Sequence, residues 1–205
     1  MDHAELATQS ELDTTVSALT ANGFMPEVLD TKEAALARIK DLIPAGSSIM
    51  NGASRTLEQV GYIDYLKAGE HGWKNLHADI LAETDEVQKA ELRKYSVVSD
   101  FYLGSAHVIT EAGQIVVASN SGSQLPHLAF TSPNIILVVS TKKLAPTLTE
   151  AFDRIDSHIV PLEDVRMHEV YGFGTLHAKT LILHKENGAI GRKVHVLFVK
   201  EDLGF

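Results

Sequence analysis

The feature that most constrains the fold is a continuous apolar run, Ile135–Val139. A strand with one face in water alternates apolar and polar residues, whereas an unbroken run suits a strand covered on both faces. Predicted strands and helices also alternate along most of the chain, which favours a three-layer α/β fold with a mostly parallel sheet flanked by helices. No linker or repeat divides the sequence. We therefore expect one domain over 1–205, with an N-terminal helix within 1–22.

Capping and turn residues predict the elements of the first half. A helix over 4–21 should stop at Asn22-Gly23, and Asp30 with Glu33 has the pattern of a capping box that opens the next helix. Ser54 is a candidate N-cap. The other expected elements are strands at 24–29 and 48–51, and a largely helical stretch over 62–95 in which 77–81 is ambiguous between helix and strand.

The second half is expected to be richer in strands. Thr147 and Glu150 form a second capping-box pattern, for a helix that runs through Ile155. The remaining elements predicted there are strands at 97–103, 108–110, 114–118, 180–184 and 194–199, with a short helix at 124–130. Residues 171–174 predict a flexible connection or a mobile aromatic flap.

Composition excludes several classes of function. The net charge is −9 without a basic patch, which argues against nucleic acid as a partner. No apolar stretch approaches the roughly 20 residues that span a bilayer, and the acidic start does not resemble a signal peptide, so we expect a cytoplasmic protein without a membrane partner. Without cysteine the chain can hold no cysteine-ligated cluster. Its ten histidines form no compact set of three ligands, so no metal site is predicted, and the cofactor is unknown.

Two loops are candidates for anion binding, Asn51–Arg55 and Asn120–Gln124. Each follows a predicted strand, contains glycine and small hydroxyl residues, and opens a predicted helix. Helix N-termini expose unpaired N–H groups that can bind a phosphate or carboxylate. The candidate ligand residues in these loops are Gly52, Ser54, Arg55, Ser121, Gly122 and Ser123. In the alternative interpretation, the serine at 54 is only a cap and the glycine at 122 only a turn.

Four segments resemble the LUD domain family, the lactate-utilisation domain. They are GASRTLEQVG (52–61), DFYLGSAHVITEAGQIVVASNSGSQL (100–125), VVSTKKLAPTLTEAFDRI (138–155) and the ending VHVLFVKEDLGF. The family is similar in fold to ribose-5-phosphate isomerase, CoA-transferases and the initiation factor 2B group, in which the corresponding loops hold sugar phosphates or acyl-CoA. The resemblance implies further ligand contacts at Gly104 and Ser105. Lys143 matches the lysine of the family's "NK" pattern after the apolar strand, although Thr141-Lys142 replaces the usual residues before it.

The chain lacks the asparagine and lysine of the downstream pattern, since Ala118 and Asn120 stand near those positions. The resemblance also departs from the isomerases at their catalytic position. Where those enzymes place a catalytic aspartate, this chain has His107, or Ala106 if the gap falls one residue earlier, so isomerase chemistry is not implied. The histidine could be a general acid/base, because imidazole titrates near neutral pH, or a polar hairpin residue. Arg55, Lys143 and Lys179 are candidates for anion contact, and the alternative for each is an ordinary surface cation.

These observations leave three hypotheses of function open. The first is a LUD-type domain that binds a small anionic metabolite and serves lactate or related organic-acid utilisation. The second is an enzyme acting on a phosphosugar or acyl-CoA thioester, with His107 as acid/base and Arg55 and Lys143 holding the anion. The third is a non-catalytic subunit that docks to an iron–sulfur oxidoreductase. A homo-oligomer is compatible with all three.

Overall fold

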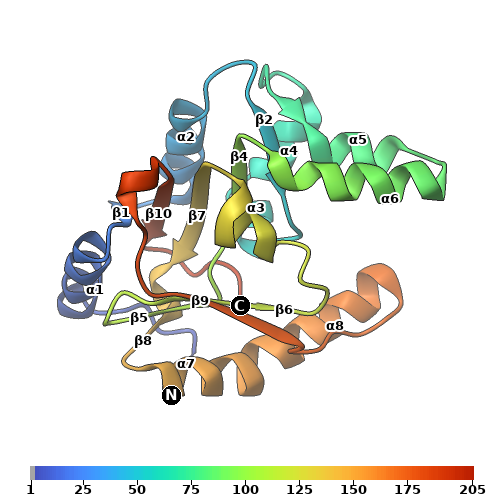
Figure 1. Cartoon of the computed structure of the whole chain (residues 1–205). Helices are drawn as coiled ribbons and strands as arrows, with labels where there is room; N and C mark the ends of the chain where they lie inside the picture. Colours follow the sequence, from blue (N-terminus) through green and yellow to red (C-terminus); the bar gives the residue numbers. More distant parts are fainter. Residues whose placement is uncertain (1–2) are drawn as a thin grey trace.

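The computed structural model describes residues 3–205, and its centre is a six-stranded sheet (Figure 1). All neighbouring strands in this sheet are parallel. In spatial order they are β1 (Met25–Leu29), β10 (Lys193–Val199), β7 (Asn134–Ser140), β4 (Phe101–Gly104), β2 (Ser48–Asn51) and β3 (Lys74–Asn75). The predicted apolar run lies in β7, between β10 and β4, and is buried throughout. The predicted α/β fold with a parallel sheet flanked by helices is confirmed.

The two faces of β7 pack against different layers. Ile136 and Val138 contribute to a core shared with helices on one face, whereas Ile135 and Leu137 contribute to a second core on the other. The helices of the first face are α2 (Lys32–Leu42), α3 (Arg55–Gln59) and α4 (Tyr62–Ala68). The second face is covered by α1 (Gln9–Ala21), the π-helix η2 (His127–Thr131) and a second sheet. Successive side chains of β7 point to opposite faces of the sheet, so this strand packs against a layer on each side.

The second sheet has mixed strand directions and was not predicted from the sequence. Its strands, in order, are β8 (Leu144–Ala145), β5 (Val108–Thr110), β6 (Ile115–Ser119) and β9 (Lys179–Leu183). The hairpin of β5 and β6 was expected, but the pairing of β6 with β9 joins segments far apart in the chain. In Figure 1 this sheet lies between the large sheet and the helices α7 (Leu148–Arg154) and α8 (Val160–Tyr171), which the π-helix η4 (Ile155–Ile159) connects.

Several expected boundaries were wrong for local reasons. The predicted strand 97–103 begins only at Phe101, because residues 96–98 form a 3-10 turn and the Asp100 carboxylate accepts hydrogen bonds from the backbone and hydroxyl of Ser48. The second helix is capped by Thr31 rather than by the box of Asp30 and Glu33. The first begins at Gln9 instead of Ala4, with a capping box of Thr8 and Glu11.

Two longer stretches also differ from the expectation. Residues 62–95 contain α4, the short strand β3, α5 (Leu76–Ala82) and α6 (Glu86–Tyr95), so the ambiguous segment 77–81 is helical. The helix expected to end at Ile155 continues through η4 into α8. Pro161 lies directly after the π-helix, within this continuous helical stretch, and its missing N–H coincides with that local interruption of the regular hydrogen-bond ladder. This continuation places α8 beside the cavity described below.

Gly113 provides a test of how the small sheet packs on α1. It has φ of 73°, and a Cβ added there would lie 2.8 Å from the backbone nitrogen of Leu19. Gly191 has a similar φ of 77° with nothing within 4 Å, so it is a matched control. Both alanine substitutions should lower the free energy of unfolding by about 1–2 kcal/mol, because alanine is strained in the left-handed backbone conformation. Gly113→Ala should lose roughly 1–3 kcal/mol more through overpacking, as urea unfolding would measure. Equal losses would contradict the packing of the hairpin against α1.

Candidate functional site

A cavity of about 270 Å³ lies at the carboxyl edge of the large sheet. Four adjacent strands, β2, β4, β7 and β10, run in the same direction, so the segments that follow them meet at this edge. These segments contribute Gly52–Thr56, Ser105–His107, Lys143 and Gly204–Phe205 to the lining. In open α/β sheets this edge is where ligands usually bind.

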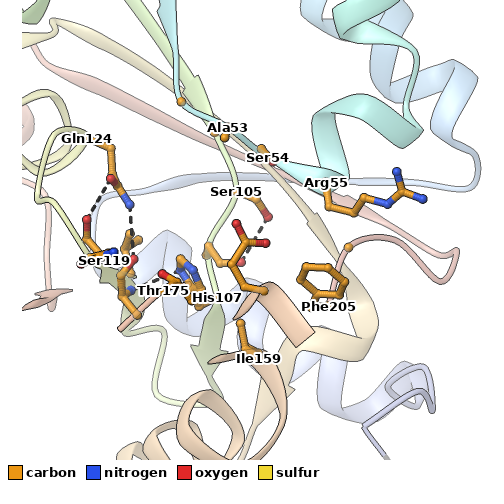
Figure 2. Close-up of a pocket in the computed structure, with 18 of the residues that line it drawn as sticks. Ala53, Ser54, Arg55, Ser105, His107, Ser119, Gln124, Ile159, Thr175 and Phe205 are labelled. Carbon is orange, nitrogen blue, oxygen red and sulfur yellow. Dashed lines mark hydrogen bonds between the residues drawn. The ribbon is translucent and has the colours of Figure 1, made fainter. Parts of the chain in front are cut away.

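The opposite walls come from the second sheet and the helices behind it. The loop after β6 contributes Asn120, Ser121, Ser123 and Gln124. Glu163 and Met167 come from α8, and residues 175–177 come from the segment between α8 and β9. Figure 2 shows Ser54, Ser105, His107, Gln124 and Thr175 around one open space, although they belong to four separate parts of the chain.

Most of the ligand residues predicted from the sequence come together in this cavity. Those that line it are Gly52, Ser54, Arg55, Gly104, Ser105, His107, Ser121, Ser123 and Lys143. Gly122 and Lys179 are absent from the lining. The Lys179 Nζ donates to the Asn120 carbonyl at 3.1 Å, and its side chain packs against Gly122, so this pair supports the loop from outside. Whether any of these residues binds a ligand stays a prediction.

Sequence reasoning missed Glu163 and Gly204. Glu163 lines the cavity because the helix that begins with α7 continues beyond Ile155 through η4 into α8. Gly204 leaves room for a lysine, since a Cβ there would lie 2.5 Å from Lys143 Nζ. No local pattern in the sequence marks Gly204, because the close approach is between two residues 61 positions apart.

Lys143 has an unusual environment for a lysine. Its side chain is buried, with the residue 5% exposed, and Nζ donates to Thr56 Oγ1 at 3.0 Å and to Ser105 Oγ at 3.3 Å. Within residues 3–205 it forms no ion pair with a carboxylate. Burial, together with the positive charges of Lys142 and Arg154, lowers the pKa of Lys143 to about 7. At neutral pH the cavity therefore holds an amine that is protonated in only part of the molecules and that lacks a counter-ion in the described part of the chain.

The neighbouring Lys142 is a natural comparison. Its Nζ forms an ion pair with Asp202 and donates to the Gly204 carbonyl at 2.9 Å. It does not line the cavity. The 3-10 turn Thr141–Lys143 after β7 directs these two consecutive side chains to different partners, one to a carboxylate and one to hydroxyl groups.

His107 differs from an ordinary acid/base histidine. Its Nδ1 accepts a hydrogen bond from the Ala118 backbone N–H at 3.2 Å, so in the neutral ring the proton lies on Nε2. Burial lowers the pKa of His107 to about 3, and the charges of Lys143 and His177 act in the same direction. The ring can therefore donate through Nε2 while remaining neutral. Proton transfer by this histidine stays a prediction, whereas hydrogen-bond donation is the role that its geometry favours.

Two charged pairs complete the electrostatics of the cavity. Arg55 is half-exposed and pairs with Glu58 at 3.2 Å, so its guanidinium is only partly available to a ligand. Glu163 lies 3.6 Å from Arg166, yet burial raises the pKa of this carboxyl, and the Glu58 charge raises it further. A raised pKa favours the neutral form. The carboxyl group at 163 thus opposes an anionic ligand less than an ordinary glutamate would.

The hydroxyl-rich loops are ordered by their own contacts. Ser54 Oγ accepts from the Leu57 N–H at 3.3 Å, which confirms the predicted N-cap. Ser119 Oγ accepts from the Gly122 N–H at 2.8 Å and donates to Gln124 Oε1 at 3.0 Å. Figure 2 shows this last contact at one side of the cavity.

Among residues 3–205, no group of three or more His, Asp or Glu side chains could hold a metal ion. The helices in the same range include none with the length and apolar character that a membrane span requires.

These features define an α/β protein with a small polar cavity at the carboxyl edge of a parallel sheet. The chain belongs to the LUD domain family, whose profile matches residues 12–199. It is similar to a solved structure, the crystal structure of a DUF162 family protein from Deinococcus radiodurans at 1.70 Å resolution, with a TM-score of 0.58. That likeness covers 95% of this chain and 99% of the other at 14% identity, so it shows the fold alone. No curated protein matches the chain.

The environment of His107 predicts its titration. Because folding lowers the pKa from 6.5 to about 3, its ring signals should stay constant as the pH falls through 6.5 and change only near the lower value or on acid unfolding. Proton NMR of the histidine ring signals would measure this, with His107→Gln identifying the resonance. A midpoint near 6.5 for the assigned signal would contradict the buried, hydrogen-bonded ring.

Proposed function

We propose that the cavity binds a small organic anion, a carboxylate metabolite of organic-acid utilisation about the size of lactate or pyruvate. The observation that carries this proposal is the Lys143 ammonium, which is buried at the cavity without a carboxylate partner in residues 3–205. An unpaired buried charge is costly, and an anionic ligand would compensate it. Ligand binding therefore accounts for a feature that is unfavourable in the empty protein.

The size and polarity of the cavity support a small ligand. Pockets that bind drug-sized ligands have volumes of roughly 300–1,000 Å³. The cavity here has a volume of about 270 Å³, below that range. The hydroxyl-bearing residues Ser54 and Thr56 line the same cavity as the lysine. Such groups can donate to carboxylate oxygens. Membership of the LUD domain family, together with the lactate-utilisation role implied by that name, supports organic acids as the first ligands to test.

Binding can be measured by thermal shift with lactate, pyruvate, ribose 5-phosphate and coenzyme A. The folded state should gain stability with the short carboxylates as RT ln(1 + [L]/Kd). Lys143→Gln should weaken their binding by roughly tenfold or more, because it removes a charge-assisted hydrogen bond of about 1.5–3 kcal/mol. Lys193→Gln is the matched control, since Lys193 lies at the start of β10, at the other end of the strand from the cavity.

The panel also separates the alternatives. If ribose 5-phosphate or coenzyme A raises the unfolding temperature and neither lactate nor pyruvate does, the ligand is a phosphosugar or an acyl-CoA thioester and the organic-acid proposal is wrong. If the acids bind but Lys143→Gln and Lys193→Gln bind them equally well, the ligand lies elsewhere and the proposed site is wrong.

A further inference from the structure

Lys143 has the features of a nucleophile as well as those of an anion contact. We propose that its Nζ forms an imine with the carbonyl carbon of a 2-oxo acid bound in the cavity. This inference rests on the proposed function, because the ligand is the same small carboxylate with a carbonyl group next to it. It adds a covalent step that anion binding alone does not require.

The position of Nζ is suited to attack on a ligand. The amine lies at the cavity, and its hydrogen-bond partners are two hydroxyl groups, Thr56 Oγ1 and Ser105 Oγ. Thr56 Oγ1 can accept from the ammonium or donate to the neutral amine. Ser105 Oγ donates to the Ala106 carbonyl at 3.1 Å and accepts from Nζ, and either form of the amine can supply that N–H, so neither partner requires Nζ to remain charged. A carboxylate partner would hold the proton on the nitrogen. The described part of the chain places none against Nζ.

The surrounding charges favour the unprotonated amine. Lys142 and Arg154 are cationic, His107 is held in its neutral form, and the carboxylate of Asp202 is paired with Lys142. Desolvation and like charge together disfavour the ammonium form of Lys143. At neutral pH the amine is therefore available in a fraction of molecules far above that of a solvated lysine, as is typical of lysines that form Schiff bases.

The proposed step balances without a further reactant. The Nζ lone pair attacks the carbonyl carbon and one N–H proton moves to the carbonyl oxygen, giving a carbinolamine. Loss of that hydroxyl with the second N–H proton releases water and leaves the C=N bond. The carboxyl group of Glu163 lines the same cavity, and burial raises its pKa, so it can give and accept the proton that moves between nitrogen and oxygen.

The experiment traps the imine in the full chain. The protein is incubated with pyruvate and sodium cyanoborohydride, and peptides are mapped by mass spectrometry. We expect a mass gain of one pyruvic acid less one oxygen atom on Lys143. A lysine with a pKa of about 7 has roughly a thousandfold larger neutral fraction at pH 7 than an ordinary lysine. Labelling of Lys143 should therefore exceed that of Lys142 and of surface lysines at least about tenfold.

Two controls separate covalent chemistry from binding. Lactate has no carbonyl group and should give no adduct, although the proposed function expects it to bind. Lys143→Arg keeps a positive charge but cannot form an imine, so it should lose trapping with pyruvate. Circular dichroism and the unfolding midpoint establish that this variant is folded.

The outcomes distinguish the two proposals. If lactate and pyruvate both stabilise the protein but Lys143 carries no adduct, or carries no more than the other lysines, the imine proposal is wrong and anion binding stands. If neither acid shifts the unfolding midpoint and no adduct forms, both proposals are wrong. Selective labelling of Lys143 by pyruvate, abolished in Lys143→Arg, is the result that supports both.

Discussion

The common direction of the strands in the large sheet is the constraint on which the rest of the structure depends. Because β2, β4, β7 and β10 are adjacent and parallel, their carboxyl ends lie at one edge. The four segments that follow them are far apart in sequence, yet they have to meet there. The apolar run 135–139 fixes β7 between two neighbours and two covering layers, so this strand sets the position of the turn that carries Lys143.

The packing and hydrogen bonds at that edge explain how an unfavourable group can persist. A buried ammonium without a carboxylate partner costs free energy, and folded proteins retain such groups where the surrounding structure is stable enough to hold them. Lys143 follows a fully buried strand, and Ser140 at the end of that strand donates to the Glu201 carbonyl, which joins the turn to the segment after β10. Thr56 and Ser105 then supply the hydrogen bonds that burial requires.

Local patterns in the sequence were sufficient for the fold class and for much of the site. The apolar run predicted the central strand, the Ser54 cap was confirmed, and the glycine and serine loops were expected at the edge where the structure places them. What the sequence could not supply were contacts between distant segments. The pairing of β6 with β9, the entry of Glu163 from α8, and the space that Gly204 leaves for Lys143 all depend on tertiary packing. Gly122 and Lys179 share the local pattern of the site residues, but they pack on each other outside the lining.

The most direct test of this account is the protonation of Lys143 itself. NMR titration of protein labelled with ¹³C-lysine follows each amine through its Cε signal, and Lys143→Arg identifies the resonance that disappears. Burial among hydroxyl groups and like charges predicts one lysine with a midpoint at a pH of about 7, well below the ordinary value of 10.5. If the signal lost in Lys143→Arg titrates at the ordinary value, the amine is solvated or ion-paired. The electrostatic basis of the proposed site would then be wrong.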